Sequence, residues 1–327
     1  MSEEGKKKTV SEIIIERFLK DVDERESMPW QRPYERYNAF NWVTTIPYRG
    51  INRLLLPFGE YLTANQINDY NKKHKTDYKF VKGIEWYPVI FFKHDIKEIT
   101  LDNVKEMFDI SGAEDDGYIG NEGVWSYYKD KGKYFKQRNI LRYSMVADRQ
   151  WFRDSNGECL PSRIETGEVE IIKAKPKEVF ENYIKREGIK VEKTGDVPCY
   201  VPCYVPALDT IRVNMYCKNE DEFYSTVFHE AGHSTGHKSR LNRVEGMKGI
   251  FGSSEYAKEE CIAEIVACLC CAECGIDQVV TSGTSVYDNN VSYVQAWKKN
   301  IKDFGKEFIY IVSQADKAFN FIMGEEI

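Results

Sequence analysis

The segment FHEAGHSTGH, residues 228–237, holds three of the five histidines of this 327-residue chain. His229 and His233 are four residues apart in a stretch with helical periodicity, so both imidazoles project from one face of a helix. Imidazole nitrogens at this spacing can reach one metal ion at about 2.0–2.1 Å. Glu230 lies one position round the helix, where its carboxylate can take a proton from a water that attacks a carbonyl carbon. The segment therefore predicts a metal site, with Glu230 as the catalytic general base.

A tetrahedral catalytic zinc site needs a third protein ligand and keeps its fourth position open. His237 is the nearest candidate, but on a continuous helix about 12 Å of rise would separate it from His229. The next expected helix offers Glu260 and Glu264, one turn apart on one face. Their spacing resembles that of gluzincins, which implies that Glu260 binds the metal and that Glu264 orients His229. The reverse assignment of the two carboxylates stays open, and Zn²⁺ or another divalent ion is the expected cofactor.

A simpler interpretation of the same residues is that the histidines are ordinary helix positions and the glutamates a solvated stripe. Apolar neighbours on the histidine helix and a carboxylate-bearing helix about 30 residues later favour the metal site. The thiols of residues 261–274 could also bind zinc, but small, partly apolar side chains on one helix favour core packing.

Composition sets the class of protein. The chain carries 46 Lys/Arg and 52 Asp/Glu and is 42% hydrophobic, which excludes a disordered chain and a small disulfide scaffold. No apolar run approaches the roughly 18 residues of a membrane span. Residues 1–9 are polar and lysine-rich, unlike a secretory signal. We therefore expect a cytoplasmic protein with no membrane partner, whose nine cysteines are mostly thiols.

Charge is unevenly distributed along the chain. Residues 31–94 carry ten Lys/Arg against five Asp/Glu, whereas residues 95–122 carry nine acids against two lysines. The basic segment is also rich in aromatic residues. Bases stack on aromatic rings while cations track phosphates, so this mixture suits single-stranded nucleic acid. The alternative is that the rings fill a core and the lysines keep it soluble.

Periodicity and turn signals indicate an α+β fold, and the length suggests two domains. Helices are expected at residues 10–25, 62–72 with Thr63 as N-cap, 176–187, 219–236 with Asn219 as N-cap, 256–274, and 291–323 as one helix or two. Strands are expected at residues 43–46, 86–92, 141–152 and 211–215. Proline at every fourth position of residues 198–206 restricts that segment to a loop or a sheet edge.

Short motifs extend in order along nearly the whole chain. They are MPW (28–30) with Pro33, YRGINRLL (48–55), YLT (61–63) with Gln66, KG (82–83), HEAGH and TGH (229–237), RLN (240–242), YAKEE (256–260) with Ala263 and Glu264, and AW (296–297). This ordered set resembles the ArdC-like antirestriction proteins of plasmids and phages. The resemblance implies a single-stranded-DNA-binding domain at residues 1–160, with an acidic insertion at about 95–122. It also implies a zincin-like metallopeptidase domain at residues 165–327.

The resemblance further implies protection of mobile-element DNA from host restriction, with single-stranded DNA and a protein or peptide substrate as partners. Expected DNA contacts are Trp42, Tyr48, Arg49, Asn52, Lys79 and Lys82. Two alternatives remain at this point. The protein could coat DNA and keep a structural or vestigial metal site, or it could be a metalloprotease whose N-terminal domain binds protein.

Overall fold

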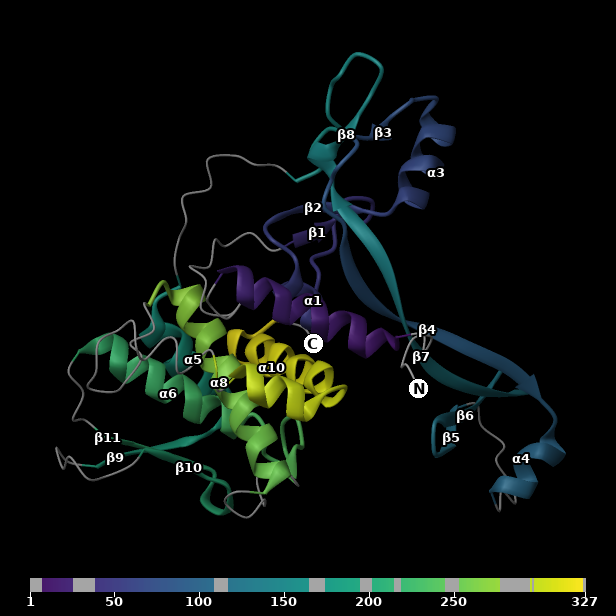
Figure 1. Cartoon of the computed structure of the whole chain (residues 1–327). Coiled ribbons are helices and arrows are strands. Elements are labelled where there is room, and N and C mark those ends of the chain that lie inside the picture. The colour runs from purple at the N-terminus through teal and green to yellow at the C-terminus, as the bar shows by residue number, and fades with distance from the viewer. Residues whose placement is uncertain are drawn as a thin grey trace, which may run out of the picture. The chain divides into compact units, whose positions relative to one another are not determined.

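The computed structural model describes residues 8–25, 39–108, 117–164, 174–194, 202–214, 219–244, 253–276, 295 and 297–325 (Figure 1). Its mixture of helices and sheets confirms the predicted α+β class. The chain forms two compact units, Met1–Tyr87 with Val146–Ile327, and Pro88–Met145. The domain boundary expected between residues 160 and 165 borders residues 165–173, outside the described residues, and stays a prediction. Within the described ranges, no helix is long and apolar enough to cross a bilayer.

Helix α6 (Glu220–Ser234) carries the histidines and packs against α8 (Ser254–Cys274) in the first unit (Figure 1). Side-chain oxygens cap both helices: Asn219 accepts from the Glu222 N–H, and Ser253 accepts from the Tyr256 N–H. Helices α5 (Pro176–Glu187) and α10 (Glu307–Met323) pack onto this pair. Residues 297–304 are also helical, and a turn at Gly305 separates them from α10, so the expected C-terminal helix is divided in two.

A three-stranded sheet lies beside α6 in the order β10 (Cys203–Val205), β11 (Thr210–Asn214), β9 (Lys190–Thr194). Strand β11 pairs parallel with β9 and antiparallel with β10, which is an edge strand of this sheet. The edge is where a proline-punctuated segment can be accommodated, because the missing N–H groups break no internal ladder. Residues 202–205 of the repeat therefore confirm the expected edge position, and a 3₁₀ turn (η3, Pro206–Leu208) follows. Residues 195–201 lie outside the described part.

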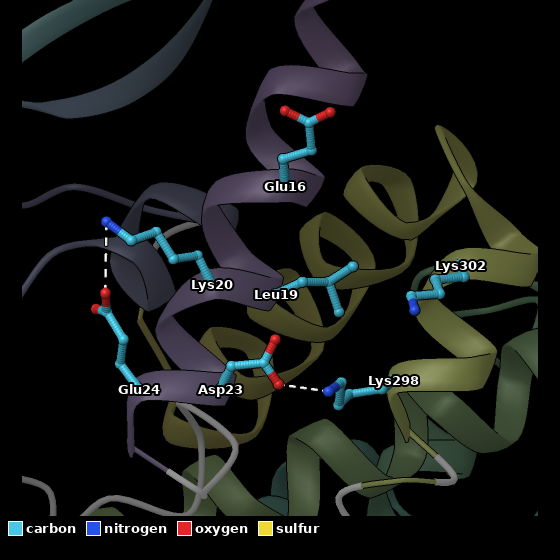
Figure 2. A pocket seen from close by; sticks show the side chains of 7 residues that line it. All are labelled: Glu16, Leu19, Lys20, Asp23, Glu24, Lys298 and Lys302. Atoms are coloured by element: carbon cyan, nitrogen blue, oxygen red, sulfur yellow. Dashed lines mark hydrogen bonds and ion pairs between the residues drawn. The ribbon is translucent and has the colours of Figure 1, made fainter.

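Helix α1 (Val10–Arg25) ends where its periodicity predicted. Its apolar stripe of Ile14, Phe18 and Val22 is fully buried, and the Phe18 ring meets the Phe308 ring of α10 edge-on at 5.1 Å. The polar side of α1 faces the helix of residues 297–304 across a shallow groove (Figure 2). Asp23 forms an ion pair with Lys298 there. The N-terminal helix is thus attached to the C-terminal helices within one unit.

Short elements between residues 39 and 80 surround a second core. Strands β1 (Ala39–Asn41) and β2 (Gly59–Leu62) pair in parallel, and β2 pairs with the end of β7 (Lys133–Asp148) at Ala147 and Asp148. Helices α2 (Ile51–Leu55) and α3 (Ala64–His74) follow β1 and β2, and a capping box of Thr63 and Gln66 opens α3. Strands β3 (Lys79–Phe80) and β8 (Phe152–Arg153) pair antiparallel, with a 3₁₀ turn (η2, Arg149–Trp151) before β8. The buried residues of this core are Trp42, Leu62, Ile67, Ala147, Phe152 and Leu160.

The strand expected at residues 43–46 is wrong. The Asn41 side-chain oxygen accepts from the Val43 and Thr44 N–H groups at 3.0 and 3.1 Å, and this bonding closes a turn directly after β1. The Asn41 oxygen offers these N–H groups a local acceptor in place of a neighbouring strand. This local bonding outweighs the β propensity of valine, threonine and isoleucine.

The second unit is mainly antiparallel sheet. It contains most of β4 (Tyr87–Ile99) and of β7 (Lys133–Asp148), whose residues Tyr87 and Val146–Asp148 belong to the first unit. It also contains β5 (Gly117–Glu122), β6 (Trp125–Asp130) and the short helix α4 (Leu101–Met107) between β4 and β5. Strands β5, β6 and β7 pair in sequence order, and β4 pairs with β7. The strand expected at 86–92 lies in the longer β4, which begins at Tyr87. Of the strand expected at 141–152, residues 141–148 belong to β7, but the strand ends at Asp148, because its side chain accepts from the Gln150 N–H and caps the 3₁₀ turn η2. The acidic stretch at 95–122 contributes the end of β4, α4 and β5.

Gly232 sets how closely α6 approaches α8. A Cβ atom at this position would lie 3.0 Å from the Ala263 Cα and 3.3 Å from the Ala263 carbonyl oxygen, both backbone atoms of α8. Backbone atoms cannot move aside as a flexible side chain can, so the glycine is required by helix packing.

We expect the Gly232→Ala substitution to destabilise the protein by about 1–3 kcal/mol through overpacking. Helix propensity alone predicts the opposite sign, a gain of about 1 kcal/mol. Urea unfolding followed by far-ultraviolet circular dichroism measures the difference. An unchanged or increased free energy of unfolding would show that α6 and α8 have room to spare.

Candidate metal centre

Three side chains from α6 and α8 converge on one point. One ligand atom each of His229, His233 and Glu260 lies within 4.8 Å of the others. The two Nε2 atoms are 3.2 Å apart, and each lies 3.5 Å from a different oxygen of Glu260. Ligands at 2.0–2.2 Å from a tetrahedral ion are separated by about 3.3–3.5 Å. The donor set and its spacing therefore fit a divalent metal such as zinc, with room for a fourth ligand.

Glu264 lies outside this cluster, on the far side of the His229 ring. Its Oε2 is 3.6 Å from the His229 Nδ1, whereas Glu260 faces the Nε2. A carboxylate at the remote ring nitrogen fixes the orientation of a ligating imidazole. The geometry supports Glu260 as the third ligand and Glu264 as the residue that orients His229. This assignment stays a prediction.

The second histidine has a corresponding partner that sequence reasoning missed. Glu259 is 4% exposed, and its Oε1 lies 3.6 Å from the His233 Nδ1. Arg243 holds both Glu259 oxygens, at 3.0 and 2.8 Å, and also donates to the Gly232 carbonyl. Burial alone would raise the pKa of Glu259, but the hydrogen bonds with His233 and Arg243 lower it. The sequence carried only a weak signal for the role of Glu259 and Arg243, since two consecutive glutamates on a helix are usually both exposed to solvent.

Glu230 is held by the edge strand. Its side chain is buried, and its Oε2 accepts from the Tyr204 N–H of β10 at 2.7 Å. The Tyr204 hydroxyl donates to Asp209 at 2.7 Å, and Arg240 donates to the same carboxylate and to the tyrosine oxygen. This network ties β10 to the end of α6, so the carboxylate of Glu230 has a defined position next to the histidines.

A cleft of 370 Å³ opens over these groups. Its lining combines the edge strand with both helices: Pro202, Cys203, Tyr204, Pro206, His229, Glu230, His233, Tyr256, Glu259 and Glu260. The Tyr256 hydroxyl hydrogen-bonds with Glu260, and burial together with this carboxylate raises the pKa of Tyr256 to about 12. Tyr256 thus stays protonated at neutral pH, and its single hydroxyl hydrogen is donated to the Glu260 carboxylate at the wall of the cleft.

Carboxylates dominate the electrostatics of the centre. Burial would lower the pKa of His229, but hydrogen bonds with Glu260 and Glu264 outweigh it and raise the pKa to about 10. The hydrogen bond from His229 in turn lowers the pKa of Glu260 to about 2. A positively charged group at the ring nitrogens is therefore favoured, whether it is a proton or a metal cation.

Among the described residues, no other histidine or cysteine takes part in the cluster. His237 lies beyond the end of α6, and its Nδ1 is bonded to the Ser239 hydroxyl at 2.8 Å. The five thiols of α8 are buried, which confirms the expected core packing: Cys261, Cys268, Cys270, Cys271 and Cys274. Cys199 lies outside the described residues.

The expected DNA contacts have different surroundings. Trp42 is 1% exposed, its Nε1 donates to the Pro161 carbonyl, and its ring packs in the core, so it offers no surface to a base. Asn52 is 9% exposed, and Tyr48 is half-buried beside Asn41. The remaining three are exposed: Arg49, Lys79 and Lys82. Trp42 is buried because it follows β1 directly and packs in the same core as Ile67 of α3 and Phe152 of β8.

Two comparisons with solved structures concern nearly the whole chain. The antirestriction protein ArdC of plasmid R388, in its metal-free form, superimposes with a TM-score of 0.58 at 21% identity, covering 97% of this chain and 99% of ArdC. The Mn(II)-bound form gives a TM-score of 0.58 at 20% identity, covering 97% and 98%. The chain has the ArdC fold. The predicted resemblance to ArdC-like proteins is thereby confirmed.

Sequence comparisons agree with this. A profile described as zincin-like metallopeptidase matches residues 178–314, the part that holds the metal centre. The DNA primase TraC of Escherichia coli is 24% identical over 331 residues, covering 98% of this chain. The chain spans 20% of the length of this TraC protein. The zincin-like domain and a fold solved with Mn(II) indicate a divalent-metal site in this chain.

The Glu264→Gln substitution is expected to weaken metal binding by about tenfold, because an amide orients the His229 ring less well than a carboxylate does. Glu260→Gln should weaken it far more, since it replaces a charged ligand. Glu255→Gln, at an exposed position in the first turn of α8, is the matched control. Competition with a chromophoric chelator measures each affinity. Equal losses of metal affinity for Glu260→Gln and Glu264→Gln would contradict the assignment of Glu260 as the ligand and Glu264 as the orienting group.

Metal affinity is also expected to rise with pH. Because the pKa of His229 in the metal-free protein is about 10, its imidazole carries a proton at neutral pH that a metal must displace. The affinity should therefore increase about tenfold per pH unit from pH 7 to 9. Titration calorimetry in two buffers of different ionisation enthalpy would detect the released proton. No proton release at pH 7 would show that His229 is neutral before the metal binds.

Proposed function

We propose that this chain is a metal-dependent peptidase joined to a region that binds single-stranded DNA. The observation that carries the proposal is the placement of Glu230 in the same cleft as the His229, His233 and Glu260 cluster. A structural metal site is closed by protein ligands, whereas this set provides three and leaves one position open toward a cleft. We propose Zn²⁺ as the physiological ion, held by these three residues.

The chain's own groups have separate roles in peptide hydrolysis. A divalent ion bound here would supply Lewis-acid polarisation of a carbonyl oxygen. Glu230 acts as general base, taking a proton from the attacking water and later delivering it to the leaving amine. The Tyr204 N–H keeps the Glu230 carboxylate directed into the cleft. The Tyr256 hydroxyl donates to Glu260 and so helps to fix the orientation of this proposed ligand.

The edge position of β10 supports a peptide substrate in particular. An extended peptide can pair with those backbone groups of an edge strand that have no partner, and the Tyr204 N–H is not one of them, since Glu230 accepts from it. In this chain the edge borders the cleft directly, since Cys203 and Tyr204 belong to both. A substrate laid along β10 would therefore bring a peptide bond close to Glu230 and the metal ligands.

The names of the relatives support a proposal for the biological role. Solved structures with this fold bear the name of an antirestriction protein, and a sequence relative bears the name DNA primase. We propose that the region before residue 160 binds single-stranded DNA and that the protein protects mobile-element DNA from host restriction in the cytoplasm. DNA binding would then bring the peptidase to proteins assembled on the incoming strand.

The Glu230→Gln substitution separates this proposal from a DNA-coating protein with a structural metal. We expect the variant to retain about one metal per chain and to lose peptidase activity by about 10²–10⁴-fold. Metal content by mass spectrometry and cleavage of a peptide library, each with and without oligo(dT), provide the measurements. Full protection of DNA from restriction by the inactive variant would assign the function to coating alone.

A double substitution, His229→Ala with His233→Ala, is the control for the metal itself. It should contain no metal after purification without added ions. Absence of metal from the unsubstituted protein, even after Zn²⁺ is supplied, would overturn the proposal that the chain is a metal-dependent peptidase.

A further inference from the structure

The outer face of the β3–β8 sheet carries an exposed tryptophan between basic side chains. Lys79 pairs with Arg153 and Phe80 with Phe152, and the Val81 N–H extends the ladder by donating to the Trp151 carbonyl at 2.9 Å. Phe152 is fully buried in the core. Arg153, the next residue of β8, points away from that core because side chains alternate along a strand, and Trp151, the last residue of η2, is exposed on the other side of Phe152 in the sequence.

The exposed fractions agree with this arrangement. Trp151 is 44% exposed and Val81 is 40% exposed, and Lys79, Lys82 and Arg153 are also exposed. Within the described ranges, neither Lys79 nor Lys82 forms an ion pair. Arg153 donates only to the carbonyl of Gly157, at 3.4 Å. A large apolar ring in contact with water, flanked by cations whose charge is not neutralised by a partner, is a surface that suits an anionic, aromatic ligand.

The surrounding helix adds charge of the same sign. Segments 64–82 and 149–160, which form α3, β3, η2 and β8, carry seven Lys/Arg against four Asp/Glu. Lys72, Lys73 and Lys75 end α3, next to the start of β3 (Figure 1). The Asn71 side chain fixes this junction by donating to the Tyr78 carbonyl at 2.8 Å and accepting from the Tyr78 N–H at 3.1 Å. The basic residues are thus presented from a hydrogen-bonded framework.

We propose that this face is the base-stacking platform for single-stranded DNA, with Trp151 stacking on a base and Lys79, Lys82 and Arg153 contacting phosphates. The proposal rests on the proposed function and gives its DNA-binding part a location. Lys79 and Arg153 are cross-strand partners and lie together on one side of Trp151, about 7 Å away along the strand direction, so both cations are within the reach of one nucleotide stacked on the ring. Stacking on an exposed ring accepts every base, which predicts binding with little sequence preference.

Two substitutions distinguish stacking from phosphate contact. Trp151→Ala should weaken binding of a fluorescent oligo(dT) of about 15 nucleotides by about tenfold and leave the salt dependence unchanged. Lys79→Ala should weaken binding and reduce the slope of log K against log salt by about one. Tyr310→Ala and Lys317→Ala, at exposed positions of α10, are the matched controls and should bind as the unsubstituted protein does.

Fluorescence anisotropy of the full chain at several salt concentrations provides all of these affinities. Trp151→Phe keeps an aromatic ring and should recover most of the binding, which separates stacking from a folding defect. Should Trp151→Ala unfold, Lys79→Ala and Trp151→Phe still decide the proposal. Unchanged affinity and slope in the β3 and β8 variants, with strong binding by the unsubstituted protein, would overturn the platform and leave DNA binding intact. Failure of the unsubstituted protein to bind oligo(dT) at low salt would overturn DNA binding itself and favour a protein partner.

Discussion

The close approach of α6 to α8 at Gly232 is the constraint on which the metal centre depends. Two histidines on one helix can define an ion's position only if a third ligand comes from a neighbouring element at the right depth. The glycine lets the α8 backbone approach until a Cβ would touch Ala263, and at that depth the Glu260 oxygens lie 3.5 Å from both Nε2 atoms. The Arg243 guanidinium then connects the Gly232 carbonyl to Glu259, so the same contact is reinforced by a buried ion pair.

Carboxylates surround both imidazoles on two sides, and this arrangement explains why the centre is suited to a cation. Glu260 faces the Nε2 atoms, whereas Glu264 and Glu259 face the Nδ1 atoms of His229 and His233. Without a cation, this concentration of negative charge in a partly buried site would be costly. The fourth carboxylate, Glu230, has a different environment, since a backbone N–H of the edge strand holds it. Position relative to β10 thus separates the proposed general base from the proposed ligand and orienting groups of the same chemical type.

The N-terminal elements of the first unit are structurally connected to its C-terminal helices. Arg53, which follows Asn52 in the YRGIN segment, pairs with the buried Asp316 of α10 and lies 4.7 Å above the Phe319 ring. Helix α1 buries its apolar stripe close to α10 at Phe308. A motif that resembles part of a DNA-binding domain therefore also has a packing role, which accounts for the burial of Asn52. The platform that we propose for single-stranded DNA lies instead at β3 and β8, where Trp151, Lys79 and Arg153 are exposed.

The sequence by itself determined the helices, their caps and the histidine pair, because these depend on contacts within about four residues. It also identified Glu260 and Glu264, since one helical turn relates them to each other. Only the tertiary structure decided that Glu260 faces the metal position, that Glu259 and Arg243 support His233, and that Tyr204 holds Glu230. Those contacts join residues 16 or more apart, and their partners are set by helix packing and sheet order. The same reason explains Trp42 and Trp151: both are tryptophans near basic residues, and only the position of the core decides which ring is exposed.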